Sequence, residues 1–229
     1  IFGWTGMVNS LSFDIAVHVG TLFSLIYCFW RDWIDIIFRD RKMLLYLIVG
    51  TIPAGFAGVA FHDIIESQLR DPLIIVFTLI FFGIMMLIAE KIGKRQREFI
   101  SLSDALVIGT AQAIALIPGV SRSGITITAG LFKGLDRAYA AKFSFLLSTP
   151  AIVGAAILDL YKSLKVGYSY DYSLFFVGVI SAGITGIIAI KFLLSFLRKY
   201  PLNFFVYYRW LLAGVIFLLY FLRKECEKR

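Results

Sequence analysis

Long windows without a charged side chain constrain the fold of this sequence more than any other feature. Three of them, 43–61, 72–89 and 172–190, each approach 20 residues, and about 20 apolar residues cross a bilayer core of roughly 30 Å as a helix. The chain is 59% hydrophobic with a mean hydropathy of +0.83, above the range of soluble domains. A buried soluble helix would explain one such window but not several. We therefore expect an all-α polytopic membrane protein.

About six transmembrane helices are predicted, at 11–30, 43–61, 72–90, 143–161, 172–197 and 202–222. The stretch 102–133 differs from these. Its first half, Leu102–Ile117, has 16 residues and as a helix is about 24 Å long, short of a full crossing. Pro118-Gly119 then ends the helix, and the second half, Ile125–Phe132, is shorter still. This pattern predicts two half-helices in a re-entrant hairpin.

Loop charge indicates how the segments are oriented. Loops 31–42 and 91–100 each carry four basic residues, whereas loop 62–71 carries one; basic loops favour the cytoplasmic side. The net charge of +8 lies in loops between apolar segments, so anionic lipid headgroups are its expected counterpart and no nucleic-acid partner is predicted. Two cysteines without C-x-x-C spacing predict neither a disulfide framework nor a zinc site.

The sequence contains an internal repeat. The pattern G-x-x-x-A-G-x-x-G occurs at 50–58 and again at 178–186, and the stretch from Phe13 matches the stretch from Phe143 at an offset of 130. Helix packing alone would explain either glycine pattern. Opposite loop charge suggests inverted repeats, as in transport folds. We expect one membrane domain, 1–229, with a truncated first repeat in 1–93 and a second in 101–223. The hairpin's counterpart would then lie before Ile1.

Arg122 is the only charged residue between Ala105 and Phe132. It lies in P-G-V-S-R-S-G-I-T, where a helix N-terminus, glycines and hydroxyls favour anion binding. Its guanidinium presents five donors that suit phosphate. The alternative is a structural arginine that pairs internally or reaches the membrane interface. The candidate anion-binding residues are Gly119, Ser121, Arg122, Ser123, Gly124, Thr126 and Gln112; for Gln112 an interhelical hydrogen bond is equally compatible with the sequence.

Other polar residues within the apolar stretches are weaker candidates. Asp14 and His18, four residues apart, share a helix face and would form either a site or a structural pair. Arg209 is the only charge between Pro201 and Leu222, and would be either functional or a structural counter-ion. Asp104 is expected to cap its half-helix. Three further charged residues are expected to form a solvated turn: Lys133, Asp136 and Arg137.

Several of these motifs occur together in a known family. The pattern Q-x-x-A-x-x-P-G-x-S-R-S-G-x-T from Gln112, FSFLLSTP from Phe143, and Tyr208-Arg209 resemble the undecaprenyl-diphosphate phosphatases of the bacitracin-resistance type. The resemblance implies a multi-pass plasma-membrane hydrolase that converts a C55 polyprenyl diphosphate into the monophosphate carrier lipid of peptidoglycan synthesis. It also implies an active site facing the outer side, a divalent cation (Mg²⁺ or Ca²⁺), contacts with membrane lipids, and a possible homodimer.

By this resemblance Ser121 and Arg122 are catalytic and Thr126 lies on the diphosphate-binding side. The family's first motif, a glutamate-rich half-helix followed by P-x-S-S-x-G-H, supplies its carboxylate, histidine and metal ligands. The sequence lacks that motif, and neither His18 nor His62 follows Ser-Gly, so those groups are expected in the counterpart hairpin. The main alternative is a transporter or flippase for an anionic lipid or phosphate-bearing substrate. A non-catalytic scaffold would leave Arg122 unexplained.

Overall fold

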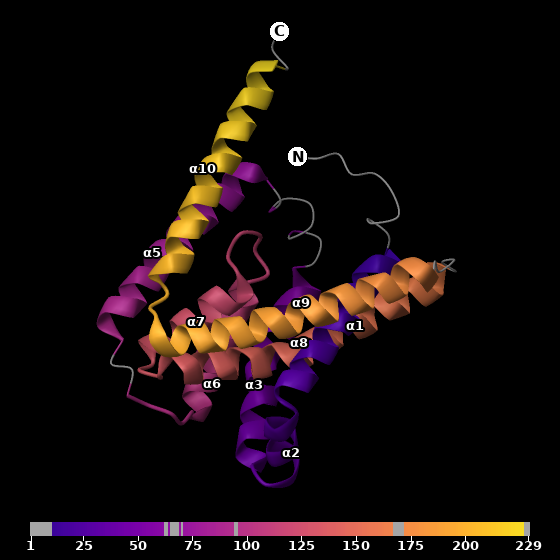
Figure 1. Cartoon of the computed structure of the whole chain (residues 1–229), viewed down its shortest axis with the longest axis vertical. Coiled ribbons are helices and arrows are strands. Elements are labelled where there is room, and N and C mark those ends of the chain that lie inside the picture. Colours follow the sequence, from indigo (N-terminus) through magenta and orange to yellow (C-terminus); the bar gives the residue numbers. More distant parts are fainter. Residues whose placement is uncertain are drawn as a thin grey trace. The chain divides into compact units, whose positions relative to one another are not determined.

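The computed structural model describes residues 11–61, 64, 69, 71–93, 96–166 and 172–226, and within these residues the regular structure is helical (Figure 1). The helices are α1 Leu11–Cys28, α2 Trp30–Phe38, α3 Arg41–Ala60, α5 Pro72–Ile92, α6 Leu102–Ile114, α7 Arg122–Phe132, α8 Arg137–Val166, α9 Tyr172–Lys199 and α10 Asn203–Cys226. The predicted all-α class is therefore confirmed.

Five helices of the described part of the chain are long and apolar enough to cross a membrane: Arg41–Ala60, Pro72–Ile92, Arg137–Leu158, Tyr172–Lys199 and Asn203–Glu225. They match five of the predicted segments. The remaining segment, 11–30, forms α1, whose apolar part Ile15–Cys28 is shorter. The helix stops there because Phe29 leaves helical geometry, with φ −116° and ψ 23°, and α2 begins after it.

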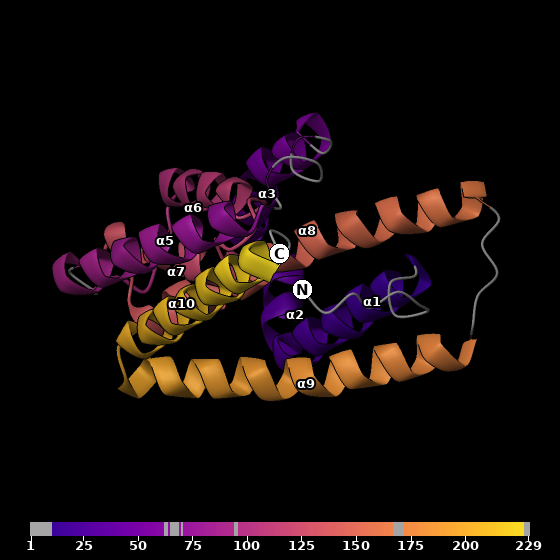
Figure 2. The same cartoon turned by 90° about the horizontal axis from the view of Figure 1, so that it is seen from above.

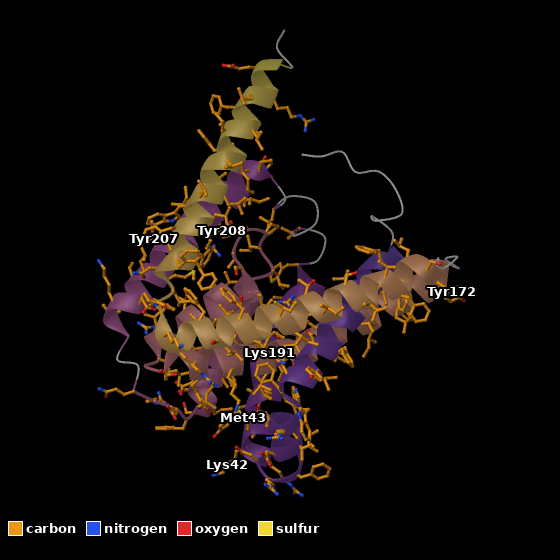
Figure 3. All side chains as sticks on the ribbon, viewed as in Figure 1. Lys42, Met43, Tyr172, Lys191, Tyr207 and Tyr208 are labelled. Atoms are coloured by element: carbon orange, nitrogen blue, oxygen red, sulfur yellow. The ribbon has the colours of Figure 1, made fainter. Side chains whose placement is uncertain are left out.

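The chain divides into two compact units. The first contains Ile1–Leu45 and Phe145–Ser195. In it, α1 lies along α9 in both views (Figures 1 and 2). A Cβ on Gly20 would lie 2.8 Å from the Cβ of Ala182 and would also collide with the Val179 carbonyl. Glycine therefore allows these backbones to approach closely. Nearby, the ammonium of Lys191 (Figure 3) lies 5.5 Å from the centroid of the Tyr27 ring.

The second unit contains Tyr46–Ser144 and Phe196–Arg229. Here α10 runs alongside α5 in both views, and α7 packs against α5 and α6 (Figures 1 and 2). Every residue of α7 from Gly124 to Leu131 is buried. This half-helix is therefore enclosed by protein and does not face lipid along that stretch. The non-helical turn that precedes α7 requires such surroundings at membrane depth, because lipid offers no hydrogen-bond partners to the backbone.

A polar cluster joins the two ends of the α6–α7 hairpin. Ser101 caps α6 and forms a capping box with Asp104, so the capping role expected for Asp104 is confirmed, with Ser101 as the N-cap. The Asp104 side chain is only 1% exposed and accepts a 2.7 Å hydrogen bond from Arg97. Lys133 Nζ lies 3.5 Å from its other oxygen. Arg97 also donates to the Lys133 carbonyl at 3.0 Å.

The expectation of a solvated turn after α7 is wrong for two of its three residues. Lys133 pairs with buried Asp104, and Arg137 pairs with buried Glu90, to which its Nε donates at 2.7 Å. Buried carboxylates require such partners, because an uncompensated charge is costly to desolvate. Asp136 instead accepts a hydrogen bond from the Ala138 amide at 2.8 Å, as a helix N-terminal side chain does.

Candidate functional site

The tip of the hairpin lies between Ile114, where α6 ends, and Arg122, where α7 begins. The second half-helix was expected to begin at Ile125, with Arg122 on the turn; the structure starts it three residues earlier. The cause is Ser121, which caps the helix by accepting a hydrogen bond from the Gly124 amide at 3.3 Å. Arg122 is therefore the first helical residue, at the positive end of the α7 dipole.

Backbone conformation at the tip is unusual. Ser121 has φ 69° and ψ 111°, and it is the only non-glycine residue with positive φ in the described part of the chain. Gly119, two residues earlier, has φ 86°. A non-glycine residue in this region costs of order 1–3 kcal/mol and persists only where its surroundings enforce it. The strained residue lies within the predicted anion-binding motif.

One side of the tip presents donors that the described residues leave unused. Ser121 and Arg122 are exposed, and Ser123 is half-buried. Among the residues that the structure describes, none accepts a hydrogen bond or forms an ion pair with the Arg122 guanidinium. The first amides of a helix have no intrahelical acceptor. The Arg122 guanidinium, the two serine hydroxyls and the first amides of α7 thus form a set of hydrogen-bond donors that suits a phosphate.

Arg209 of α10 occupies the other side of the tip and is 6% exposed. Its guanidinium donates to the carbonyls of Val120 and Gly119, both at 2.9 Å, and more weakly to those of Thr78 and Leu79, both at 3.4 Å. No carboxylate of the described residues pairs with it. Among the described residues, the partners of Arg209 are therefore backbone carbonyl dipoles and not a carboxylate.

The two remaining candidates are buried. Thr126, 1% exposed, donates to the Arg122 carbonyl at 2.8 Å, and its hydroxyl lies 2.6 Å from that of Ser144. The Thr126 hydroxyl is thus engaged in fixing the start of α7 against α8. Gln112 is 2% exposed, and neither of its amide atoms pairs with a described residue. Unpaired buried amides are rare.

The groups expected to supply acid–base chemistry or bind a metal are not assembled here. His18 is half-buried in α1, while the Asp14 side chain and His62 lie outside the described residues. Within the part of the chain that the structure describes, no three His, Cys, Asp or Glu side chains are grouped so as to hold a metal ion. The described residues do not by themselves fit a divalent cation.

Sequence reasoning missed Thr78. Its Oγ1 donates to the Pro118 carbonyl at 2.8 Å, so that α5 also contacts the tip. A signal was present, because Thr78 carries the only hydroxyl in the window 72–89. Ser144, which contacts Thr126, was missed as well; it lies in a stretch where serine and threonine recur, and nothing distinguishes it in sequence.

Comparison with known proteins shows that the chain belongs to one family. The family model described as bacitracin resistance protein BacA matches residues 1–215. An undecaprenyl-diphosphatase of Thermodesulfovibrio yellowstonii is 79% identical over 223 residues, covering 97% of this chain and 87% of that protein. Undecaprenyl-diphosphatases of Moorella thermoacetica and Marinobacter nauticus are 42% and 43% identical, covering 93% and 94% of this chain and 85% and 86% of those proteins.

Proposed function

Because the chain belongs to the BacA bacitracin resistance family, we propose that it is an undecaprenyl-diphosphate phosphatase. It hydrolyses a C55 polyprenyl diphosphate to the monophosphate and inorganic phosphate, and so regenerates the carrier lipid of cell-wall synthesis. The observation that carries this proposal is Arg122, an exposed residue whose guanidinium has no partner among the described residues. It lies at the N-terminus of a half-helix that is buried from Gly124 to Leu131.

In the reaction, the bond from the terminal phosphorus to the bridging oxygen breaks, the lipid monophosphate leaves, and water supplies the oxygen and protons that complete inorganic phosphate. Arg122 and the first amides of α7 bind the terminal phosphoryl oxygens and neutralise the charge that develops on them. Ser121 and Ser123 add hydroxyl donors beside Arg122, and Gly119 and Gly124 allow the backbone to approach the phosphate. Since the described residues do not fit a divalent cation, we assign that cation no step.

We further propose a plasma-membrane location with the site open to the outer side, and loop charge supports this orientation. The two ends of the hairpin meet at loop 91–100, where the Arg97 amide donates to the Gly134 carbonyl at 3.1 Å and the Asp136 amide donates to the Arg97 carbonyl at 2.9 Å. This loop is one of the two basic loops, and basic loops lie on the cytoplasmic side. The tip of the hairpin therefore points away from the cytoplasm.

The test is phosphate release from undecaprenyl diphosphate by the purified full-length protein in detergent. We expect Arg122→Ala to lower kcat/KM by a factor on the order of 10² or more, the scale of losing one preorganised transition-state donor. The matched control is Arg198→Ala, because Arg198 is an exposed arginine near the end of α9; it should keep wild-type activity. Near-normal release by Arg122→Ala would refute the site. Substrate binding by the wild type without phosphate release would instead indicate a transporter.

A further inference from the structure

Three consecutive carbonyl groups at the hairpin tip accept hydrogen bonds from side chains of α5 and α10. Thr78 donates to Pro118 at 2.8 Å, and Arg209 donates to Gly119 and to Val120, both at 2.9 Å. We propose that Thr78 and Arg209 form a carbonyl clamp that fixes the phosphate-binding backbone, Arg209 being a positioning residue and not a catalytic one. The proposal rests on the proposed function.

Peptide geometry explains how the clamp acts on Ser121. A trans peptide is planar, and its C=O and N–H point in opposite directions; the described chain contains no cis peptide. When Arg209 binds the Val120 carbonyl, the Ser121 amide must point away from Arg209. The positive φ of Ser121 is then the consequence of a peptide plane fixed from α10. Without that contact, the plane would be free to rotate and relieve the strain.

The clamp also changes the electrostatics of the tip. Carbonyl oxygens repel a phosphate, and the clamp binds three of them on the side of α5 and α10. Arg209 meets only carbonyl groups among the described residues, so it keeps its net positive charge. Its Nη1 is 3.6 Å from the position that a Cβ on Gly124 would occupy, directly behind the N-terminus of α7. The buried charge therefore adds to the helix dipole that faces the anion.

Side-chain shape makes arginine necessary in this position. The planar guanidinium reaches the carbonyls of Gly119, Val120 and α5 at once. A lysine ammonium keeps the charge but is compact and has three donors, so it cannot reproduce this arrangement. The two residues that precede Arg209, Tyr207 and Tyr208 on α10 (Figure 3), are more than half exposed, at 60% and 61%. Only Arg209 of these three is directed into the protein.

The experiment compares Arg209→Lys and Thr78→Val with the wild type, each as the full-length protein in detergent. Three quantities are measured: kcat and KM for phosphate release from undecaprenyl diphosphate, the rise in melting temperature on adding inorganic phosphate, and the melting temperature without it. Arg198→Lys and Thr110→Val are the matched controls. Arg198 is exposed, and the Thr110 hydroxyl bonds only within its own helix, to the Leu106 carbonyl.

We expect Arg209→Lys to lower kcat by a factor on the order of 10², as loss of a preorganised donor network does, and to abolish phosphate-induced stabilisation. Thr78→Val removes the hydroxyl that donates to the Pro118 carbonyl at 2.8 Å and, within its own helix, to the Ile75 carbonyl at 3.0 Å. It should lower kcat by a factor on the order of 10. Thr78→Val retains the shape of the side chain, so we expect it to fold. If Arg209→Lys does not fold, Thr78→Val still tests the clamp. KM should change less than kcat in both variants, because the turn contacts only the diphosphate and most of the lipid substrate binds elsewhere.

Wild-type kcat and wild-type phosphate stabilisation in folded Arg209→Lys or in Thr78→Val would overturn the clamp. So would losses of activity that occur only in step with the fraction of unfolded protein. Failure of the proposed function has a different signature. A wild type that releases no phosphate, yet is stabilised by inorganic phosphate in an Arg209-dependent way, would refute the phosphatase assignment and retain the clamp.

Discussion

Replacing Gly119 with alanine tests the geometry of the hairpin tip most directly. Gly119 has φ 86°, and an added Cβ would collide with Thr78 Oγ1 and lie 3.0 Å from the Ile75 carbonyl oxygen and 3.2 Å from the Ile75 Cα. The left-handed conformation costs an alanine roughly 1–2 kcal/mol. Overpacking adds about 1–3 kcal/mol, because the Ile75 backbone cannot rotate away as a flexible side chain would. The native turn should therefore be disfavoured by about 2–5 kcal/mol.

Because the collision lies in the turn between α6 and α7 and not within a helix, we expect the turn to rearrange before the protein unfolds. Phosphate release by Gly119→Ala should fall by a factor on the order of 10² or more, while the melting temperature in detergent falls only modestly. Thr78→Ala in the same background removes the closest collision and should restore part of the melting temperature. It should not restore activity, because the bond to the Pro118 carbonyl is lost.

The control for the glycine substitution is Gly214→Ala in α10, where an added Cβ meets nothing within 4 Å. Alanine is the better helix former by up to about 1 kcal/mol, so this variant should match or slightly exceed the wild type in stability. If Gly119→Ala kept wild-type activity and melting temperature, the positive φ at the tip and the contact with α5 would both be refuted.

Two further substitutions test the supports of the hairpin. Thr126→Val leaves the Ser144 hydroxyl without its 2.6 Å partner and should destabilise the protein by about 1–3 kcal/mol in unfolding measurements; a stability equal to the wild type would contradict that contact. At Asp104, which lies outside the five candidate spans, burial alone would raise the pKa, but hydrogen bonds from Ser101 and Arg97 outweigh it and lower the pKa. A lowered pKa stabilises the protein above the ordinary carboxyl pKa, and this stabilisation is lost as pH falls through the folded-state value. Asp104→Asn should therefore be less stable than the wild type near neutral pH, and its melting temperature should not show this loss as the pH falls. A pH profile of the melting temperature equal to that of the wild type would contradict the lowered pKa of Asp104.

Much of this architecture could be predicted from residue type and spacing alone. Uncharged windows determine where helices can cross a bilayer, and Pro118-Gly119 in an apolar stretch requires a break. The start of α7 could not be placed as reliably, since it depends on Ser121 adopting positive φ, which serine rarely does without outside contacts. Those contacts come from α10, 89 and 90 residues away in sequence.

The role of Arg209 illustrates a more general limit. A lone arginine in an apolar helix is visible in the sequence, but its acceptors are backbone carbonyls, which every residue carries. No residue pattern identifies which carbonyls will face it. The same limit applies to Lys133 and Arg137, which resemble solvated charges in sequence and yet pair with buried carboxylates from distant segments. Their role becomes visible only once α5 and α6 are in place.

The bond from Arg209 to the tip also sets an order of assembly. α10 is the most C-terminal helix of the described residues, whereas the hairpin whose tip it fixes precedes it by roughly 90 residues. During synthesis, the hairpin enters the membrane with its turn still able to sample other peptide orientations. If Arg209 fixes the turn as proposed, we expect the strained geometry at Ser121 to form only after α10 has packed along α5. The last of these helices to be made is thus the one that completes the anion-binding turn.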